Sequence, residues 1–273
     1  MWRVALTQAV VFAVLQGLAA IFPIGVSTHT ALLTRFTGWE APGPAEVVAT
    51  QAAVLLAMLA YFWSDLFDMG VGLVRAAKGK RDPGARLAAQ LLASAIAAMV
   101  LTVAIERFLA GLAEGLLWIG WLSVGGALTL LVFDRMCMTV KRVEHATLVD
   151  AVLIGLAQAI ALLPGMRSAG APVTIARLLG YERDEAVRFA LLAGALPLTA
   201  GLVKTLISAH AAGAALQFGR TDLIAGGIGF VMALASIASL MSWLRRSSFT
   251  PFAIYRLLAA AAVLVLAYEL ISF

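Results

Sequence analysis

The sequence predicts an all-α integral membrane protein, with six transmembrane helices and two inverted re-entrant helical hairpins in a single domain spanning residues 1–273. Three features lead to this prediction: an apolar composition, basic residues in alternate connections, and one stretch of sequence that occurs twice. Hydrophobic residues make up 62% of the chain and charged residues 13%, against about 45–50% and about 25% in soluble domains. So little charge cannot cover a water-facing surface, and we therefore expect a multi-pass membrane protein.

Six apolar stretches are each long enough to cross a bilayer, which takes roughly 20 residues for roughly 30 Å of hydrocarbon. They are Glu46–Trp63, Arg86–Ile105, Gly115–Phe133, Arg188–Ser208, Leu223–Leu244 and Pro251–Ile271. The N-terminal stretch is also apolar, but no small-residue cleavage site follows it cleanly, so we expect it to be retained. Cys137 is the single cysteine, which excludes an intrachain disulfide and a thiolate metal cluster.

Basic residues are concentrated in three connections between the spans. These are Asp65–Arg86, Asp134–Asp150 and Trp243–Pro251, whereas the other two long connections hold one arginine each. Cytoplasmic loops of membrane proteins carry an excess of Lys and Arg, so the three connections should share the cytoplasmic side and both termini should lie outside. The net charge of +5 is explained by these loops, and it indicates no nucleic-acid partner.

The segment Leu148–Gly180 must enter and leave the membrane on one side if the second and third basic connections are both cytoplasmic. Its helical part, Val152–Leu163, has 12 residues, or about 18 Å of helix, which is too short to cross. Pro164 lacks an amide donor and Gly165 permits unusual dihedral angles. Such a break is tolerated at membrane depth only inside protein or beside a wet cavity. The segment is therefore predicted to be a re-entrant hairpin.

A similar stretch occurs near the N-terminus. The run "AVLQGLAAIFPIGVSTHTALLTRFTGWE" (Ala13–Glu40) parallels "GLAQAIALLPGMRSAGAPVTIARLLGYE" (Gly155–Glu182), with Pro23 matching Pro164. The charge pattern gives the two copies opposite orientations. Inverted repeats with broken helices place a polar site between their tips near the membrane midplane. Either hairpin could instead be a kinked full span, above all the first. The repeats cover about residues 1–64 and 148–208.

Polar residues gather at both predicted tips. An ionisable group at membrane depth is a functional hypothesis by default. The fork of Arg167 suits phosphate, and His29 could be a nucleophile or a general acid. We therefore predict a site for a lipid phosphate. The catalytic candidates are His29, Arg167, Ser27 and Ser168, and the binding candidates are Gln16, Thr28, Gln51, Gly165 and Gly170. The alternative roles are helix caps for the hydroxyls and interhelical hydrogen bonds for Gln51 and Gln158.

The chain resembles the undecaprenyl-diphosphate phosphatase family, whose members are of the bacitracin-resistance type. The likeness rests on the Pro23–His29 turn, on Gln51 with "YFWSDLF", and on "ALLPGMRSAGA", "LLGYERDEAVRFALLAGALP" and "SFTPFAIYRLLAAAAVLVL". It implies a protein of the bacterial inner membrane that removes the terminal phosphate of a C55 polyprenyl diphosphate, recycling the carrier of cell-wall precursors. The resemblance also implies a divalent cation, Mg²⁺ or Ca²⁺, and leaves a homodimer open.

The motif residues depart from the family pattern. Two acidic residues, four apart, are replaced by Gln16 and Ala20, and neither an amide nor a methyl group supplies the carboxylate oxygens that hard cations prefer. The position of the family's arginine is Ser168, and Arg167 stands one residue earlier. No metal-ligating residue is therefore predicted. Two interpretations stay open: a polyprenyl-diphosphate phosphatase, or a non-catalytic homologue that binds or flips a lipid phosphate.

Overall fold

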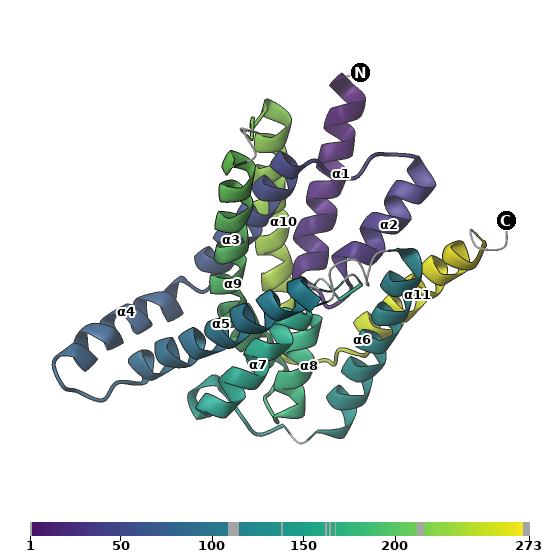
Figure 1. Cartoon of the computed structure of the whole chain (residues 1–273). Helices are drawn as coiled ribbons and strands as arrows, with labels where there is room; N and C mark the ends of the chain where they lie inside the picture. Colours follow the sequence, from purple (N-terminus) through teal and green to yellow (C-terminus); the bar gives the residue numbers. More distant parts are fainter. Residues whose placement is uncertain are drawn as a thin grey trace.

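The computed structural model describes residues 2–108, 115–137, 139–161, 163, 165–166, 168–211 and 216–269, with side chains from residue 6 onward (Figure 1). Within these ranges the regular elements are helices, and one isolated bridge pairs Lys141 with Tyr181. The α-helices are α1 Trp2–Ile21, α2 Val26–Thr37, α3 Pro44–Tyr61, α4 Trp63–Ala77, α5 Pro83–Phe108, α6 Leu116–Met136, α7 Leu148–Ile160, α8 Gly170–Leu178, α9 Arg183–Ala211, α10 Arg220–Leu244 and α11 Thr250–Glu269. A short 3₁₀ helix, η1, covers Val143–His145.

Six of these helices are long and apolar enough to span a membrane: α3, α5, α6, α9, α10 and α11. Each one contains most of a predicted span, so the prediction of six transmembrane helices is confirmed. The largest extension is in α9, which has 29 residues and starts at Arg183 rather than Arg188. Its first turn contains Asp184 and Glu185, and acidic side chains favour a helix N-terminus because of the helix dipole.

Two helical hairpins, α1–α2 and α7–α8, break where the sequence predicts. Gly25 has φ +89° immediately before α2, and Gly165 has φ +79° in the turn after α7. Helices α7 and α8 have 13 and 9 residues, fewer than the roughly 20 that a crossing needs. Helix α1 has 20 residues and is long enough to cross. Re-entry of the hairpins into the membrane stays a prediction.

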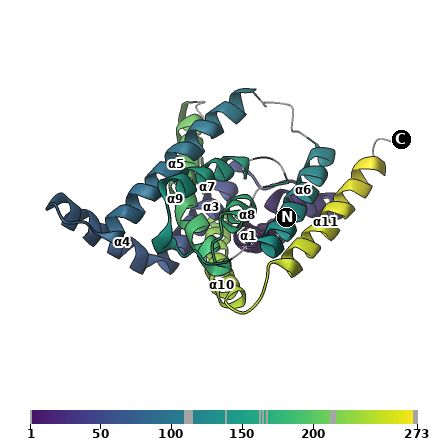
Figure 2. The same cartoon turned by 90° about the horizontal axis from the view of Figure 1, so that it is seen from below.

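The helices pack in a pattern that repeats between the two halves of the chain. Helix α1 packs on α10 as α7 packs on α5, and α2 contacts α11 as α8 contacts α6. The equivalent pairs α3–α9 and α6–α11 join the halves (Figure 1). Figure 2 shows α6 and α11 together on one side of the central helices, opposite the projecting α4 and α5. Equivalent helices of the two halves therefore have equivalent neighbours, and the inverted repeat itself stays a prediction.

The three basic connections lie at the same end of the molecule. Arg86 at the start of α5 donates through Nη2 to the carbonyl of Ala146, in the α6–α7 connection, at 2.6 Å. Phe249, in the α10–α11 connection, donates its amide to Asp134 Oδ2 at 3.1 Å. In Figure 1 the α4–α5, α6–α7 and α10–α11 connections are toward the lower side, and the N-terminus is at the upper side. The structure thus joins the loops that the charge pattern assigns to the cytoplasm.

Asp134 is the centre of a buried ion-pair cluster at this end. Its Oδ1 lies 3.0 Å from Arg177 Nε and 2.8 Å from Arg183 Nε. The side chains of Asp134 and Arg177 are each 1% exposed. Removing one partner of such a pair leaves an uncompensated buried charge and typically costs about 3–5 kcal/mol. The cluster therefore ties together α6, α8 and α9.

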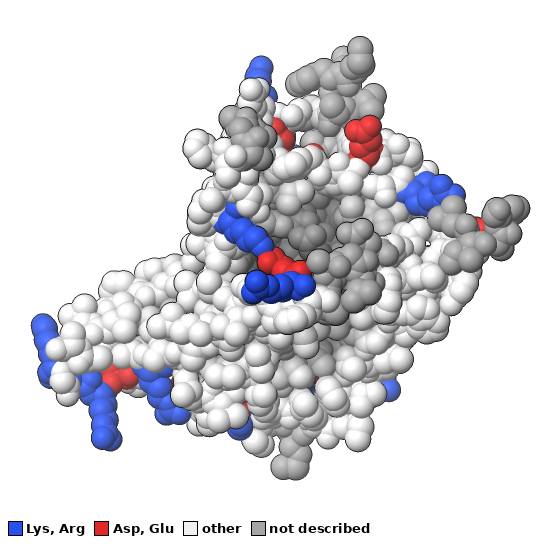
Figure 3. All heavy atoms as spheres, in the orientation of Figure 1, with Lys and Arg blue, Asp and Glu red and all other residues white. Residues whose placement is uncertain are grey.

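Helix α4 is a correction to the sequence analysis, which treated Asp65–Arg86 as a connection only. The structure has a helix of 15 residues there, Trp63–Ala77, and its turn to α5 is closed by Arg75 and Asp82 at 3.1 Å. The hydrogen bonds from Arg75 and from the Gly84 amide hold the pKa of Asp82 below its ordinary value. Figure 3 shows Lys and Arg gathered around this free end, whereas uncharged residues cover most of the same face. The helix is too short for a span, and we did not anticipate it.

Candidate active site

The turns of the two hairpins touch each other. The amide of Ala169 donates to the carbonyl of Ala20 at 3.2 Å, which is a direct backbone bond between the hairpins. A Cβ at Gly25 would lie 3.3 Å from the Gly165 carbonyl oxygen. A Cβ at Gly170 would lie 3.5 Å from the Cβ of Pro23. Glycine residues thus allow the backbones of the two turns to approach each other closely.

His29 lies in the first turn of α2 and is 9% exposed. Its Nδ1 is 2.7 Å from the Gly25 carbonyl oxygen. A carbonyl only accepts hydrogen bonds, so Nδ1 carries the proton in the neutral ring. Nε2 is then the basic nitrogen, and it lies 2.8 Å from the hydroxyl of Tyr255 on α11. The two rings also stack, with centroids 5.4 Å apart.

A second group of polar side chains connects the hairpins to α6 and α11. Ser123 Oγ lies 3.2 Å from Thr28 Oγ1 and 3.2 Å from Arg256 Nε. Arg256 Nη2 donates to the Gly165 carbonyl at 2.8 Å and lies 3.2 Å from Met166 Sδ. Arg256 itself is 0% exposed. The two hairpin turns are therefore held against a buried guanidinium group.

The remaining predicted residues divide into those near the turns and those away from them. Ser168 Oγ accepts from the Gly170 amide at 3.2 Å, and Ser27 is half-buried beside Thr28. Arg167 and Pro164 lie outside the described residues. Gln16 is half-buried on α1. No hydrogen bond between described residues joins Gln51 on α3 to the turns, so its predicted role in binding has no contact to support it.

Gln158 and Thr174 have structural partners. Gln158 Nε2 donates to the Ala190 carbonyl at 2.6 Å, which is the interhelical bond considered as its alternative role. Thr174 Oγ1 donates to the carbonyl of Gly170 at 2.7 Å, within its own helix.

Sequence reasoning missed three site residues: Ser123, Tyr255 and Arg256. The last two are in "PFAIYR", which we used only as a mark of resemblance. A signal was available, because an arginine in a span is rare and faces the protein interior. Ser123 gave no such signal, since serine is common in spanning helices.

The residues at the turns do not fit the divalent cation that the resemblance implies. Gln16 and Ala20 stand where carboxylates would bind it. The described residues also contain no group of three or more His, Cys, Asp or Glu side chains that could hold a metal ion. We therefore derive no catalytic step from a protein-bound metal.

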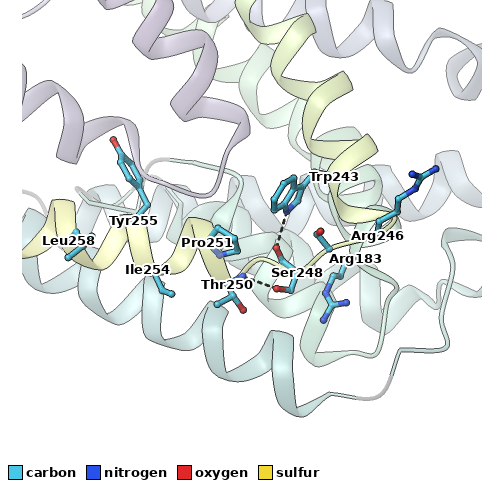
Figure 4. A pocket seen from close by; sticks show the side chains of 10 residues that line it. Arg183, Trp243, Arg246, Ser248, Thr250, Pro251, Ile254, Tyr255 and Leu258 are labelled. Atoms are coloured by element: carbon cyan, nitrogen blue, oxygen red, sulfur yellow. Dashed lines mark hydrogen bonds between the residues drawn. The ribbon is translucent and has the colours of Figure 1, made fainter.

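A groove of about 820 Å³ runs along α11 (Figure 4). Tyr255 and Leu258 lie toward one end, and the Tyr255 side chain points away from α11 toward His29 of α2. Arg183 and Arg246 lie at the other end, near Ser248 and Thr250. The outer wall of the groove is apolar and includes Pro251, Ile254 and Leu258. The groove therefore leads from the partner of His29 along a surface suited to a hydrocarbon chain.

Comparison with known proteins identifies the family. The family described as "Bacitracin resistance protein BacA" matches residues 9–262. Undecaprenyl-diphosphatase 1 of Rhodospirillum rubrum is 43% identical over 271 residues, covering 96% of this chain and 95% of that protein. Undecaprenyl-diphosphatase 1 of Paramagnetospirillum magneticum is 38% identical, with 96% and 97% covered. Undecaprenyl-diphosphatase of Roseobacter denitrificans is 36% identical, with 97% and 99% covered. The chain is a multi-pass membrane protein that belongs to the bacitracin resistance protein BacA family.

Proposed function

We propose that this protein is a polyprenyl-diphosphate phosphatase of the bacterial inner membrane, acting on the C55 carrier lipid. The family and the names of the relatives support the reaction class. The observation that carries the proposal is the His29–Tyr255 pair, in which Nε2 and the phenol oxygen are 2.8 Å apart beside the meeting hairpin turns. An acid–base pair of this kind at a junction of oriented backbone groups suits phosphoryl transfer to water.

The proposed reaction breaks the bond between the terminal phosphorus and the bridging oxygen. Water attacks the terminal phosphorus, and polyprenyl phosphate leaves with the bridging oxygen and its electron pair. The proton from water passes to His29 Nε2, with the Tyr255 hydroxyl as the relay, because that hydroxyl occupies the only direct hydrogen bond of Nε2 among the described residues. The products are polyprenyl phosphate and inorganic phosphate.

The groove along α11 is the proposed site for the prenyl chain. Its wall holds Ile254 and Leu258, which are 49% and 67% exposed. Apolar side chains on that face cost little in lipid and would contact the isoprene units directly. Because Tyr255 belongs to both the groove and the His29 pair, a chain in the groove would leave its head group at the hairpin turns.

Phosphate release from farnesyl diphosphate by the purified protein tests the proposal. We expect turnover by the wild type and a loss of at least about 100-fold in kcat for His29→Gln, in line with the usual size of general acid–base catalysis. The loss for Tyr255→Phe should be smaller, about tenfold, or about 1.4 kcal/mol of barrier. His145→Gln is the matched control, since His145 is exposed in η1, and it should retain wild-type kcat. Tight lipid binding by the wild type without any phosphate release would support the non-catalytic alternative instead.

A further inference from the structure

Helix α4 and the first part of α5, residues 63–92, form an arm that projects sideways from the other helices (Figures 1 and 2). The two helices pack closely, because a Cβ at Gly72 would lie only 2.5 Å from the amide nitrogen of Ala85. At the base of the arm, Asp65 of α4 forms an ion pair with Arg188 of α9. The arm is therefore a compact two-helix unit that is anchored to the rest of the protein.

Helix α4 has an apolar outward side and a charged side next to it. Trp63, Phe67 and Val74 are 66%, 63% and 58% exposed, and residues four and seven apart share a helix face. Asp68 and Arg75 each lie one residue further on, about 100° around the helix. The side of α4 toward α3 and α9 borders a further apolar cavity of about 340 Å³. A helix of this kind lies where lipid head groups meet the hydrocarbon.

The free end of the arm is basic. Lys78, Lys80 and Arg81 lie in the turn from α4 to α5, and all three are exposed. They take part in none of the ion pairs between described residues, whereas the neighbouring Arg75 is paired with Asp82. Figure 3 shows Lys and Arg side chains reaching outward from this end. Three positive charges thus lack an acidic partner within the described part of the chain.

We propose that the end of the arm binds the head groups of anionic phospholipids in the cytoplasmic leaflet. Lys78, Lys80 and Arg81 contact the phosphates, while the apolar side of α4 contacts the acyl chains. Basic clusters on or beside an amphipathic helix attract anionic lipids. The arm's turn lies at the end of the molecule where the basic connections meet. This surface is separate from the site of the proposed reaction, and its lipid contacts fix the depth of the arm in the bilayer.

A second copy of the chain is the competing occupant of the apolar side of α4. The arm contains three carboxylates, and those of Asp65 and Asp82 are already in ion pairs. The arm of a second copy would therefore offer only Asp68 to three positive charges. A surface of anionic head groups can offer one negative charge to each. Charge complementarity thus favours lipid over a second copy.

The test uses the whole protein in phosphatidylcholine nanodiscs, with a fluorescent label at the end of α4. Ala77→Cys, combined with Cys137→Ala, gives a single exposed labelling position for bimane. A nitroxide on a lipid acyl chain quenches bimane only at short range. Quenching by nitroxide-labelled phosphatidylglycerol, divided by quenching by nitroxide-labelled phosphatidylcholine, therefore measures the lipid preference at this position.

We expect phosphatidylglycerol to be enriched beside the label at least about fivefold over phosphatidylcholine. The enrichment should fall steeply when the salt concentration is raised to about 1 M, where the Debye length is only about 3 Å. A preference that rested on acyl-chain contacts alone would not respond to salt in this way.

The decisive variant replaces the three unpaired basic residues by glutamine. Lys78→Gln with Lys80→Gln and Arg81→Gln should abolish the enrichment and leave the melting temperature unchanged, because these side chains are in no ion pair with a described residue. The matched control removes three exposed positive charges that lie outside the basic connections, and it should keep the wild-type enrichment. Its changes are Arg35→Gln, Arg107→Gln and Arg220→Gln.

Two results would overturn the proposal. One is equal quenching by both lipids in the wild type, or an undiminished enrichment in the triple glutamine variant. The other is a dimer in which a second copy covers the apolar side of α4. Neither lipid would then quench the label strongly, and Phe67→Ser would convert the dimer to a monomer in mass measurements on the nanodiscs.

Discussion

The two hairpins pack against equivalent neighbouring helices, but they contribute different functional groups at the point where their turns meet. The first hairpin supplies His29, a side chain that can transfer protons. The second supplies backbone groups and the Ser168 hydroxyl, with the Gly165 carbonyl bound to α11. Successive residues of a helix point about 100° apart, and α11 uses this: Tyr255 reaches the first hairpin and Arg256 reaches the second. A repeated scaffold thus positions two unlike tips, and a helix outside both hairpins completes the site.

The largest effect that tests this difference is expected from replacing the two turn glycines, Gly25 and Gly165, by alanine. Both glycines have positive φ, +89° at Gly25 and +79° at Gly165, and a side chain there costs about 1–2 kcal/mol. A Cβ at Gly165 would also overlap the backbone of Ile119, whereas a Cβ at Gly25 would reach only close contact. We expect Gly165→Ala to lose a further 1–3 kcal/mol or so through overpacking.

The measurement is the melting temperature and kcat of each purified variant. Gly165→Ala should show the larger fall in both. Equal effects of the two substitutions would mean that the second turn is no more tightly packed than the first.

The sequence predicted the scaffold better than the site. Span length and composition are local properties, so the six helices could be recognised from apolar runs, and the turn glycines marked the hairpin breaks. Helix α4 was missed because a short basic segment resembles a loop when only spans are sought. Ser123 and Tyr255 were missed because they lie within spans and carry no charge that marks them, whereas Arg256 was missed although an arginine in a span is such a mark. Their arrival at the turns depends on how α6 and α11 pack, which is long-range information that a local pattern does not contain.

Glutamate at positions 16 and 20, where the family has acidic residues, should allow the first hairpin to bind a divalent cation. Gln16 and Ala20 are four residues apart on α1 and so share a helix face. We expect Gln16→Glu with Ala20→Glu to increase Mg²⁺- or Ca²⁺-dependent hydrolysis by about tenfold, about 1.4 kcal/mol of barrier. Phosphate release with added cation and with EDTA measures the effect. Unchanged cation dependence in a folded double variant would show that other features of the first hairpin also prevent metal binding.

The smallest expected effect is a difference in the free energy of unfolding between variants of two glutamines, Gln16 in the first hairpin and Gln158 in the second. Gln158 donates to the Ala190 carbonyl at 2.6 Å and joins α7 to α9, whereas no hydrogen bond between described residues involves the side chain of Gln16. Interhelical hydrogen bonds in membrane proteins contribute about 0.6 kcal/mol on average. Gln158→Leu should therefore lower the free energy of unfolding by about 0.6–1.7 kcal/mol, and Gln16→Leu should leave it unchanged within measurement. Denaturation in mixed detergent provides both values. A greater loss of unfolding free energy for Gln16→Leu would mean that the first hairpin depends on a polar contact at this position. The assignment of Gln158 as structural and of Gln16 as facing the site would then be wrong.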